Sequence, residues 1–511
     1  MEKIQYSWCP GTMCNDEIVA ECSLLYSNNY GYWSDNNPNG LSGRVKLSKE
    51  RIYEMLSHYD TDLYYALNSE HSIVGYAIAL RKKIKGYGVF SWVTQLVVHE
   101  NYRHRGIAKN LLFSIWGLSN DYAWGIITSN PYAVRALEKA TRRRSIPVRI
   151  KKNIKKIMSV GSENINYIKN VTEYIVDTDN SKVNTNFFVD HAGLTEKMFN
   201  VISEETPWLL GELNDGWEWA AFTFNDQEQI SLNQEEIFNM LNTSDDIVKL
   251  AYSRMSISDS HKWTLHTNQE VSYIEEESSM LPGQTIIDFG CGQGRHSLRF
   301  CEMGYNVFSV DYVEKNIQQI QLKSRFLNGK INAVVGDCRY ITLHEKADVA
   351  ICLYDVIGSF SNEKDNLMII KNIFNHLKKG GIAFISVMNY ELTNSIAKHK
   401  FKLDVNPNEL LRLTASNTME KTGDIFDPDL FLVDDSNHLV YRREQFSAGR
   451  ELPVELVVRD KRYSRKEIME LCKSVGFLVE YANYVSAKDW KCHLESTNPH
   501  AKEILLKCIK P

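Results

Sequence analysis

Apolar residues recur along the first half of the chain with strand-like and then helix-like spacing. Residues 72–80 (SIVGYAIAL) and 90–98 (FSWVTQLVV) are rich in β-branched and aromatic side chains, which is typical of strands. Residues 108–118 place four apolar side chains on one helical face, namely Leu111, Leu112, Ile115 and Leu118. Four further strand or helix patterns are assigned to the same sheet system: 122–128, 131–139, 186–190 and 216–224. The first half is therefore predicted to be mixed α/β.

The second half alternates strand and helix patterns more regularly. Residues 231–274 are helical and amphipathic, and they are expected to cover the sheet that follows. Beyond them, helical patterns separate five strand patterns, at 285–288, 307–311, 333–335, 349–354 and 382–388. Such alternation predicts a doubly wound, mostly parallel sheet with helices on both faces. Two last patterns, 478–485 and 503–509, are expected to close the sheet as a strand pair.

A chain of 511 residues is too long for one hydrophobic core, so we place a domain boundary near residue 226. The predicted domains are 1–225 and 226–511, the second with leading helices at 226–284 and an insertion at 390–463. The insertion is expected to contain a hairpin and to carry acceptor specificity or an extra sheet edge. Its basic residues are expected to meet an anionic substrate or water: Arg442, Arg443, Arg450, Arg459, Lys461 and Arg462.

Composition narrows the partners and the compartment. The 64 acidic residues exceed the 59 basic ones, and the net charge of −5 argues against nucleic acid or membrane binding over the whole surface. The N-terminal residues lack the apolar region of a secretory signal, and no apolar run is long enough to span a bilayer, so the cytoplasm is the expected compartment. The 10 cysteines show no C-x-x-C spacing, so we expect reduced thiols and no metal site.

The most informative run is residues 285–296, TIIDFGCGQGRH. Gly290, Gly292 and Gly294 follow a buried strand, where glycine lets the backbone turn tightly and approach a ligand. The G-x-G-x-G spacing differs from the G-x-G-x-x-G of a dinucleotide pyrophosphate loop. Asp311 ends the next strand, where a carboxylate can accept hydrogen bonds from both ribose hydroxyls. Asp337 follows the third strand, within reach of an adenine amino group.

This ordered set resembles the class I S-adenosylmethionine-dependent methyltransferases over residues 226–511. The resemblance implies S-adenosyl-L-methionine as cofactor, with Asp311 at the ribose, Asp337 near the adenine, and Asp288 at the loop or the methionine end. The residues assigned to cofactor binding are Asp288, Gly290, Cys291, Gly292, Gly294, Asp311, Tyr312, Asp337 and Cys338. A generic Rossmann-like domain for another nucleotide is the alternative.

Candidate catalytic residues lie where ligands bind in open α/β sheets, at the carboxyl edge. Tyr354, Asp355 and His296 are candidates for a general base or for orienting the acceptor. Residues 353–357 read LYDVI, without the [N/D/S]-P-P-[Y/F] tetrad of many nucleobase amino-methylating enzymes. The chain also lacks the Pro-Cys pair of cytosine C5 methylation. A small-molecule acceptor is therefore favoured over nucleic acid.

A second anion-binding loop follows the strand pattern at 90–98. The R-x-x-G-x-A run from Arg103 to Ala108 opens a helix, so backbone N–H groups point at a pyrophosphate. This run resembles motif A of the GNAT superfamily of N-acetyltransferases, which implies acetyl-CoA or another acyl-CoA as cofactor, with residues 95–98 beside the pantetheine arm. The residues assigned to this cofactor are Leu96, Val98, Arg103, Arg105, Gly106, Ile107, Ala108, Asn130 and Ala133.

The first half departs from the GNAT pattern where the chemistry is expected. The similar N-x-x-A-x-x-x-Y motif, at 130–137, ends in Leu137 instead of the tyrosine that protonates the leaving thiolate. Tyr132 is the candidate substitute for this general acid. A glutamate base on the strand is not evident, because Gln95 cannot take a proton.

A basic run, residues 142–156, follows with four apolar residues interleaved: Ile146, Val148, Ile150 and Ile154. We interpret it as a solvated strand or connector, and a docking strip for RNA, DNA or the CoA 3′-phosphate is the alternative. Trp208, Trp217 and Trp219 are expected to fill a core and not to stack on bases.

Together the two loops predict a bifunctional transferase, a GNAT-like N-acetyltransferase fused to a methyltransferase. One alternative is a methyltransferase whose non-catalytic GNAT-like domain recognises the substrate. Another is an RNA or DNA modification enzyme. The acceptors and the oligomeric state are not predicted, because a fold by itself carries reaction classes and not substrates.

Overall fold

The computed structural model describes residues 2, 4–117, 119–203, 206–230, 245–255, 262–327, 329–401, 413–421, 423–446 and 452–511. The chain divides into two compact units. The first comprises Met1–Leu232 with Ser447–Pro453, and the second comprises Asn233–Phe446 with Val454–Pro511. Within the described residues, no helix has the length and apolar character needed to cross a membrane.

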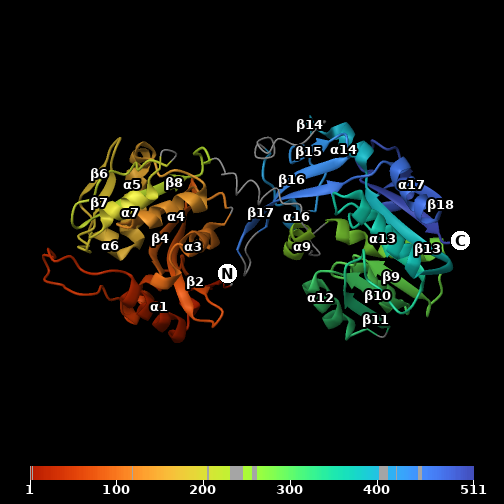
Figure 1. The fold of residues 1–511 in the computed structure, drawn as a ribbon, viewed down its shortest axis with the longest axis horizontal. Helices are drawn as coiled ribbons and strands as arrows, with labels where there is room; N and C mark the ends of the chain where they lie inside the picture. The colour runs from red at the N-terminus through yellow and green to blue at the C-terminus, as the bar shows by residue number, and fades with distance from the viewer. Residues whose placement is uncertain are drawn as a thin grey trace. The chain divides into compact units, whose positions relative to one another are not determined.

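The first unit is built on an eight-stranded sheet of order β1-β2-β3-β4-β5-β8-β7-β6 (Figure 1). Its strands are β1 (Gln5–Pro10), β2 (Thr61–Leu67), β3 (Ile73–Ile84), β4 (Gly88–Val98), β5 (Ala123–Thr128), β6 (Tyr174–Val176), β7 (Ser181–Asn184) and β8 (Trp217–Phe224). β4 and β5 pair in parallel, whereas their other neighbours pair antiparallel. The first unit is therefore a mixed α/β fold with one large sheet, as the pattern predicts.

Helices join and cover these strands. They are α1 (Asp16–Asn29), α2 (Lys49–Leu56), α3 (Ile107–Trp116), α4 (Pro131–Thr141), α5 (Pro147–Asn164), α6 (Asn166–Lys169) and α7 (Leu194–Val201). The predicted apolar face of α3 is buried, except that Leu118 lies outside the described residues. Trp92, Trp219 and Phe222 are fully buried in the core, which confirms the core role predicted for Trp219, and Trp208 packs edge-on against Trp219.

The interpretation of residues 142–156 as a strand or connector is wrong. Pro147–Asn164 forms helix α5, with proline in its first turn, and Ile150, Ile154 and Ile157 are buried. These isoleucines are spaced four and three residues apart, which places them on one helical face. Their burial outweighs the weak preference of β-branched residues for strands.

The apolar run at 186–190 also differs from its predicted strand. The strand lies earlier, as β7, and within 186–190 only Val189 forms an isolated bridge, with Trp33. Asn186 has a φ of 56°, a left-handed conformation that interrupts an extended chain.

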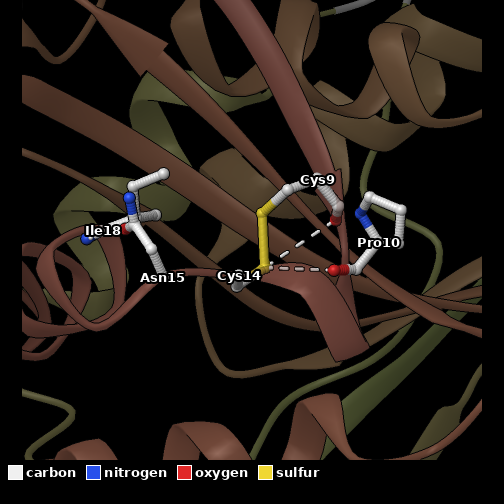
Figure 2. The surroundings of a disulfide bond; sticks show 5 residues. All are labelled: Cys9, Pro10, Cys14, Asn15 and Ile18. Atoms are coloured by element: carbon white, nitrogen blue, oxygen red, sulfur yellow. Dashed lines mark hydrogen bonds between the residues drawn. A yellow bond between two sulfur atoms is a disulfide. The ribbon is translucent and has the colours of Figure 1, made fainter.

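Cys9 and Cys14 form a disulfide, so the expectation that all cysteines are reduced is wrong for this pair (Figure 2). A short 3-10 turn, Gly11–Met13, reverses the chain between β1 and α1 and brings the two Cα atoms to 5.8 Å, within the range that a disulfide spans. Asn15 then caps α1 by accepting a hydrogen bond from the Ile18 N–H at 2.9 Å.

The second unit contains an eight-stranded sheet of order β11-β10-β9-β12-β13-β20-β18-β19 (Figure 1). Its strands are β9 (Thr285–Phe289), β10 (Asn306–Asp311), β11 (Lys330–Val335), β12 (Ala347–Cys352), β13 (Leu377–Met388), β18 (Leu478–Ser486), β19 (Asp489–Leu494) and β20 (Glu503–Ile509). The five strands from β9 to β13 are parallel, and β20 pairs antiparallel with β13 and β18. The strand order reverses between β9 and β12, which is where open α/β sheets bind ligands.

The helices of this unit are α9 (Asp245–Arg254), α10 (Thr267–Ser278), α11 (Arg295–Glu302), α12 (Glu314–Ser324), α13 (Glu363–His376) and α17 (Arg465–Val475). Part of the predicted leading helical region, at 231–244 and 256–261, lies outside the described residues. The Rossmann-like, doubly wound sheet predicted for this half is confirmed.

The insertion forms its own four-stranded sheet, of order β14-β15-β16-β17. It includes α14 (Tyr390–Ile396), β14 (Lys400–Phe401), α16 (Thr418–Lys421), β15 (Phe431–Asp434), β16 (Leu439–Phe446) and β17 (Val454–Lys461). Contrary to expectation, Arg442 and Arg462 are buried, and Arg442 forms ion pairs with Glu444 and Asp460. Arg450 lies outside the described residues.

Gly125 offers a test of the packing in the first unit. A Cβ at this position of β5 would lie 1.9 Å from the Phe222 ring of β8, whereas one at Gly31 would meet nothing within 4 Å. We expect Gly125→Ala to lower the free energy of unfolding by about 1–3 kcal/mol, because the core must shift to accept it. Urea unfolding of both alanine variants measures this, and equal stability of the two would contradict the packing described.

Candidate functional site

The glycine loop of the second unit leaves β9 and opens α11. The N–H groups of Gly290 and Cys291 both donate to the Val310 carbonyl of β10, at 2.8 and 3.0 Å. Gly290 has a φ of 73°, and a Cβ there would lie 2.4 Å from the Val356 side chain. Gly294 has a φ of 78° and precedes the helix without a side-chain cap. Glycine is thus required by conformation and by packing, and Gly294 itself provides no side-chain cap for α11, although Asp288 accepts from the Ser297 N–H in its first turn.

Asp311 fastens this loop to the end of β10. Its carboxylate accepts hydrogen bonds from the backbone N–H of Gly292 at 2.9 Å and of Val313 at 2.8 Å, and from the Asn316 amide at 3.3 Å. Burial raises the pKa of Asp311 above its ordinary value, and these bonds oppose that shift. A carboxylate has about four lone-pair positions, so a further hydroxyl donor can be accommodated. The residue fits the ribose role that the resemblance implies.

Asp288 and Asp337 are engaged in different ways. Asp288 accepts a hydrogen bond from the Ser297 hydroxyl at 2.6 Å, which fixes the first turn of α11, and burial raises its pKa to about 6. Partial burial acts to raise the pKa of Asp337, but hydrogen bonds from Arg339 hold it below its usual value. Arg339 donates to Asp337 through its backbone N–H and through its guanidinium. Cys291 and Cys338 are buried beside this loop.

Tyr354 and His296 both meet Glu270, a buried residue of α10. The Tyr354 hydroxyl donates to one Glu270 oxygen, and His296 Nε2 lies 2.7 Å from the other. Arg295 donates to Glu270 at 2.6 Å, and its Cζ lies over the Tyr354 ring, 4.7 Å from the centroid. The structure therefore brings three of these residues, from α11 and from the end of β12, together around one carboxylate.

Burial and these contacts set the protonation states of Glu270 and His296. Burial acts to raise the pKa of Glu270, but the hydrogen bond from His296 and the charge of Arg295 hold it at about 2. Burial and the charge of Arg295 lower the pKa of His296 to about 4, so its ring is neutral near pH 7. A neutral imidazole that is bonded to Glu270 is suited to positioning its neighbours, and the same geometry holds the Tyr354 hydroxyl.

Asp355 faces a different set of groups. The Tyr252 hydroxyl of α9 donates to it at 2.8 Å. Burial and the nearby charge of Asp460, from the insertion, raise the pKa of Asp355 above its ordinary value. The Tyr312 ring packs edge-on against Tyr252, 6.4 Å away between centroids. Asp355 is thus a carboxyl group of raised basicity at the carboxyl edge of the sheet.

Sequence reasoning missed three residues of this region: Glu270, Tyr252 and Glu503. They lie in helical or closing-strand patterns, far along the chain from the glycine loop, and no motif marks them. A carboxylate at the start of a largely apolar closing strand, EILLKCI, was the one available signal for Glu503.

The predicted pyrophosphate loop of the first unit joins β4 to α3. His104 and Gly106 have φ values of 59° and 78°, and Gly106 precedes α3 without a side-chain cap. Arg103 turns back, donating to the carbonyls of Val98 and Asn29, and Arg105 lies over the Tyr102 ring at 4.8 Å. Ile107 is buried and Ala108 half-buried beneath the loop. The loop therefore exposes an uncapped helix start beside basic side chains.

The parallel strands β4 and β5 separate toward their carboxyl ends. They pair from Phe90–Ala123 to Val93–Ile126, and no pairing between them is present beyond that point in the described residues. β4 also has a register irregularity against β3, where Ile78 and Ala79 face Gln95 and Val93. Leu96 and Val98 lie on this separated segment and are half-buried.

The remaining first-unit candidates surround the start of α4. Asn130 caps this helix by accepting a hydrogen bond from the Tyr132 N–H at 3.0 Å, and Ala133 is buried. The Tyr132 ring packs edge-on against His104 of the predicted pyrophosphate loop, 5.0 Å between centroids. Leu137 is fully buried. The structure thus brings Tyr132, and not residue 137, to the loop.

Glu218 of β8 is a further titratable group near the end of β5. It is buried and accepts a hydrogen bond from the Thr185 hydroxyl at 2.8 Å. Burial raises its pKa to about 7, although hydrogen bonds from Thr185 and the Ser129 backbone oppose the shift. Within the described parts of the chain, no lysine, arginine or histidine forms an ion pair with it.

Comparison with known proteins finds similarity within the second unit. Residues 286–381 match the model of a methyltransferase domain family. Cypemycin N-terminal methyltransferase from Streptomyces sp. is 30% identical over 105 residues, which are 20% of this chain and 42% of that protein. Ubiquinone biosynthesis O-methyltransferase from Rickettsia akari (strain Hartford) is 29% identical over 128 residues, 25% of this chain and 45% of that protein.

The chain thus spans less than half the length of these two relatives. A solved S-adenosylmethionine-dependent methyltransferase from Clostridium acetobutylicum shares 16% identity, with a TM-score of 0.35 over 49% of this chain and 92% of that one. The second unit therefore combines a Rossmann-like sheet with a segment, residues 286–381, that matches a methyltransferase domain family.

Glu218 generates a prediction on stability. Its pKa rises from 4.5 in the unfolded chain to about 7 in the fold, so protonation stabilises the folded state. That contribution is fully present below pH 4.5 and is lost as the pH rises through 7, a fall of roughly 3 kcal/mol in the free energy of unfolding. We expect Glu218→Gln to abolish this fall in urea unfolding between pH 5 and 8, whereas the exposed Glu70→Gln should retain it. An unchanged slope in Glu218→Gln would contradict the assignment.

Proposed function

We propose that this protein is a methyltransferase that uses S-adenosyl-L-methionine, bound at the carboxyl ends of β9, β10 and β11. The observation that carries the proposal is the arrangement around Asp311. One buried carboxylate holds the glycine loop of β9 and keeps acceptor capacity at the reversal of strand order. The methyltransferase family match to residues 286–381 supports it. When bound, the cofactor supplies an electrophilic methyl group.

We assign the following roles in cofactor binding and methyl transfer to residues of this chain. Asp311 binds the ribose and Asp337 lies near the adenine, while the glycine loop and Asp288 hold the methionine end. Asp355 orients the acceptor or takes its proton, because its raised basicity suits a general base. Tyr354 and His296 act through Glu270 as positioning residues.

We propose a second function for residues 1–225, the binding of acetyl-CoA or another acyl-CoA for N-acetyl transfer. A specific observation favours it: among the described residues, β4 and β5 pair only as far as Val93 and Ile126, so residues 95–98 run beside the loop that opens α3 without pairing with β5, as a site for a pantetheine arm requires. Tyr132 is the candidate general acid, since it packs on His104 of the same loop. Residues 226–511 would then form the methyltransferase domain, and the whole chain a bifunctional transferase in the cytoplasm.

Two alternatives differ in what the first unit does. In one, it binds substrate without chemistry, which the burial of Leu137 at the usual tyrosine position favours. In the other, the basic face of α5 binds RNA or DNA. Arg149 and Lys156 of this helix are already engaged, with Asp226 and with the Tyr87 ring, which disfavours a docking strip. A small-molecule acceptor remains our proposal.

Asp311→Asn tests the methyltransferase proposal. The amide replaces one accepting oxygen with a donor, which opposes the N–H groups of Gly292 and Val313. Hydrogen bonds to a charged group are worth about 1.5–3 kcal/mol, so we expect S-adenosylhomocysteine to bind about 10–100-fold more weakly by calorimetry.

Asp348→Asn is the matched control. Asp348 lies at the amino ends of the strands, away from the proposed site, and its carboxylate accepts a hydrogen bond from the Thr285 N–H. Equal affinity of the two variants would refute the assigned cofactor site. No binding by the unmodified protein would refute the function.

Gly106→Glu tests the acyl-CoA proposal. The new carboxylate would repel the pyrophosphate, and a side chain would strain a backbone with a φ of 78°. We expect calorimetric binding of acetyl-CoA to fall at least about tenfold. Gly86→Glu is the matched control, because Gly86 has a φ of 80° and, as at Gly106, a Cβ there would meet nothing within 4 Å. Equal effects of the two changes would count against this binding site.

A further inference from the structure

Glu503 is a buried carboxyl group with unused bonding capacity. It is 2% exposed, and its Oε2 has no hydrogen-bond partner among the residues that the structure describes. It opens β20 and pairs with Met388, the last residue of β13, so it lies at the carboxyl edge of the sheet. An unpaired buried carboxylate oxygen is costly unless a ligand or proton satisfies it.

Four residues from other parts of the second unit interact with Glu503. Ser386 of β13 donates a hydrogen bond to it, and the charges of Glu270, Arg295 and Asp355 all act on it. Burial and the two neighbouring carboxylates together raise the pKa of Glu503 to about 8. Ser386 also accepts a hydrogen bond from the Tyr354 N–H, next to Asp355, so Glu503 lies within electrostatic range of Glu270 and Asp355.

Not every carboxyl group around Glu503 has an ion-pair partner among the described residues. Arg295 pairs with Glu270, and Arg442 pairs with both Glu444 and Asp460. The guanidinium of Arg462 donates to Thr393 and to the Ile425 carbonyl and lies 4.0 Å from Asp460. Asp355 and Glu503 form no ion pair with any described residue, although both lie beside this network. Among the residues that the structure describes, two carboxyl groups of this region are therefore left without an ion-pair partner.

Aromatic rings border the same region. Tyr252 donates its hydroxyl to Asp355, and its ring lies next to Tyr312, whose buried hydroxyl has no partner among the described residues. Carboxylates beside aromatic faces are the surroundings that suit an ammonium group, through charge and cation–π attraction.

We propose that Asp355 and Glu503 recognise the positively charged nitrogen of the methyl acceptor, so that the acceptor is an amine. This inference rests on the proposed methyltransferase function and names its substrate class. Glu503 is the recognition residue, because its Oε2, which has no hydrogen-bond partner among the described residues, can accept an N–H from the acceptor. Asp355, at the end of β12, is the proton acceptor.

The chemistry requires a proton acceptor because an ammonium nitrogen has no lone pair. Asp355 takes one proton from the acceptor, which leaves a neutral amine. The nitrogen then forms the N–CH3 bond as the S–CH3 bond breaks, and the bonding electrons stay on sulfur. The products are the methylated ammonium and S-adenosylhomocysteine, and Asp355 returns its proton to water.

The test compares amines with matched hydroxyl compounds on the full chain: tyramine with tyrosol, putrescine with 1,4-butanediol, and ethanolamine with ethylene glycol. Thermal unfolding with saturating S-adenosylhomocysteine measures binding, and formation of S-adenosylhomocysteine from the cofactor measures turnover. We expect at least one amine to raise the unfolding temperature and to be methylated, and its hydroxyl partner to do neither.

Variants separate recognition from folding. Glu503→Gln should raise KM for the amine at least about tenfold with little change in kcat, and Glu503→Asp should recover part of the loss. Asp355→Asn should lower kcat and remove its dependence on the titration of that carboxyl group. Glu480→Gln, an exposed change on β18, is the control and should leave both constants unaltered.

Three results would overturn the inference while the cofactor still binds. They are preference for the hydroxyl compounds, no effect of any amine on unfolding temperature or turnover, and an unchanged KM in Glu503→Gln. Failure of the unmodified protein to bind S-adenosylhomocysteine would instead remove the methyltransferase function itself. The two failures are therefore distinguishable.

Discussion

A carboxylate buried at the end of a strand must be hydrogen-bonded, and Asp311 meets this constraint with backbone N–H groups from two loops. One bond fixes the glycine loop after β9, and the other fixes the turn that begins α12. Because both loops leave neighbouring parallel strands, this single side chain sets the shape of the edge where the order of strands reverses. Asp311 thus holds both loops that border the proposed cofactor site.

The carboxyl groups of the second unit differ in how their charge is compensated. Glu270 receives His296, Arg295 and Tyr354, and it remains charged although it is buried. Asp355 and Glu503 form no ion pair among the described residues, and burial makes both more basic. The first group acts as structural support, whereas the other two are placed where an acceptor with a positive charge would complete the network.

In the first unit, backbone geometry shapes the proposed cofactor site. β4 and β5 pair only near their start, and the following loop turns through left-handed residues into α3. Uncapped N–H groups and the separated strand edge then converge at the same place. The edge contact between Tyr132 and His104 adds a proton-carrying side chain to that place.

Local patterns in the sequence were sufficient for β3, β4, β5 and β8 of the first sheet, for every strand of the second sheet except β19, and for the glycine loop and Asp311, because strand periodicity and positive-φ glycines depend on near neighbours. They misassigned α5, where β-branched residues happen to lie on a helical face, and they missed the disulfide that the turn at Gly11–Met13 closes. Only the tertiary structure decided that Glu270 holds His296 and Tyr354, and that Glu503 lies near Asp355 with an Oε2 that has no partner among the described residues. Burial and charge balance arise from elements far apart in the chain, and no spacing of residues encodes them.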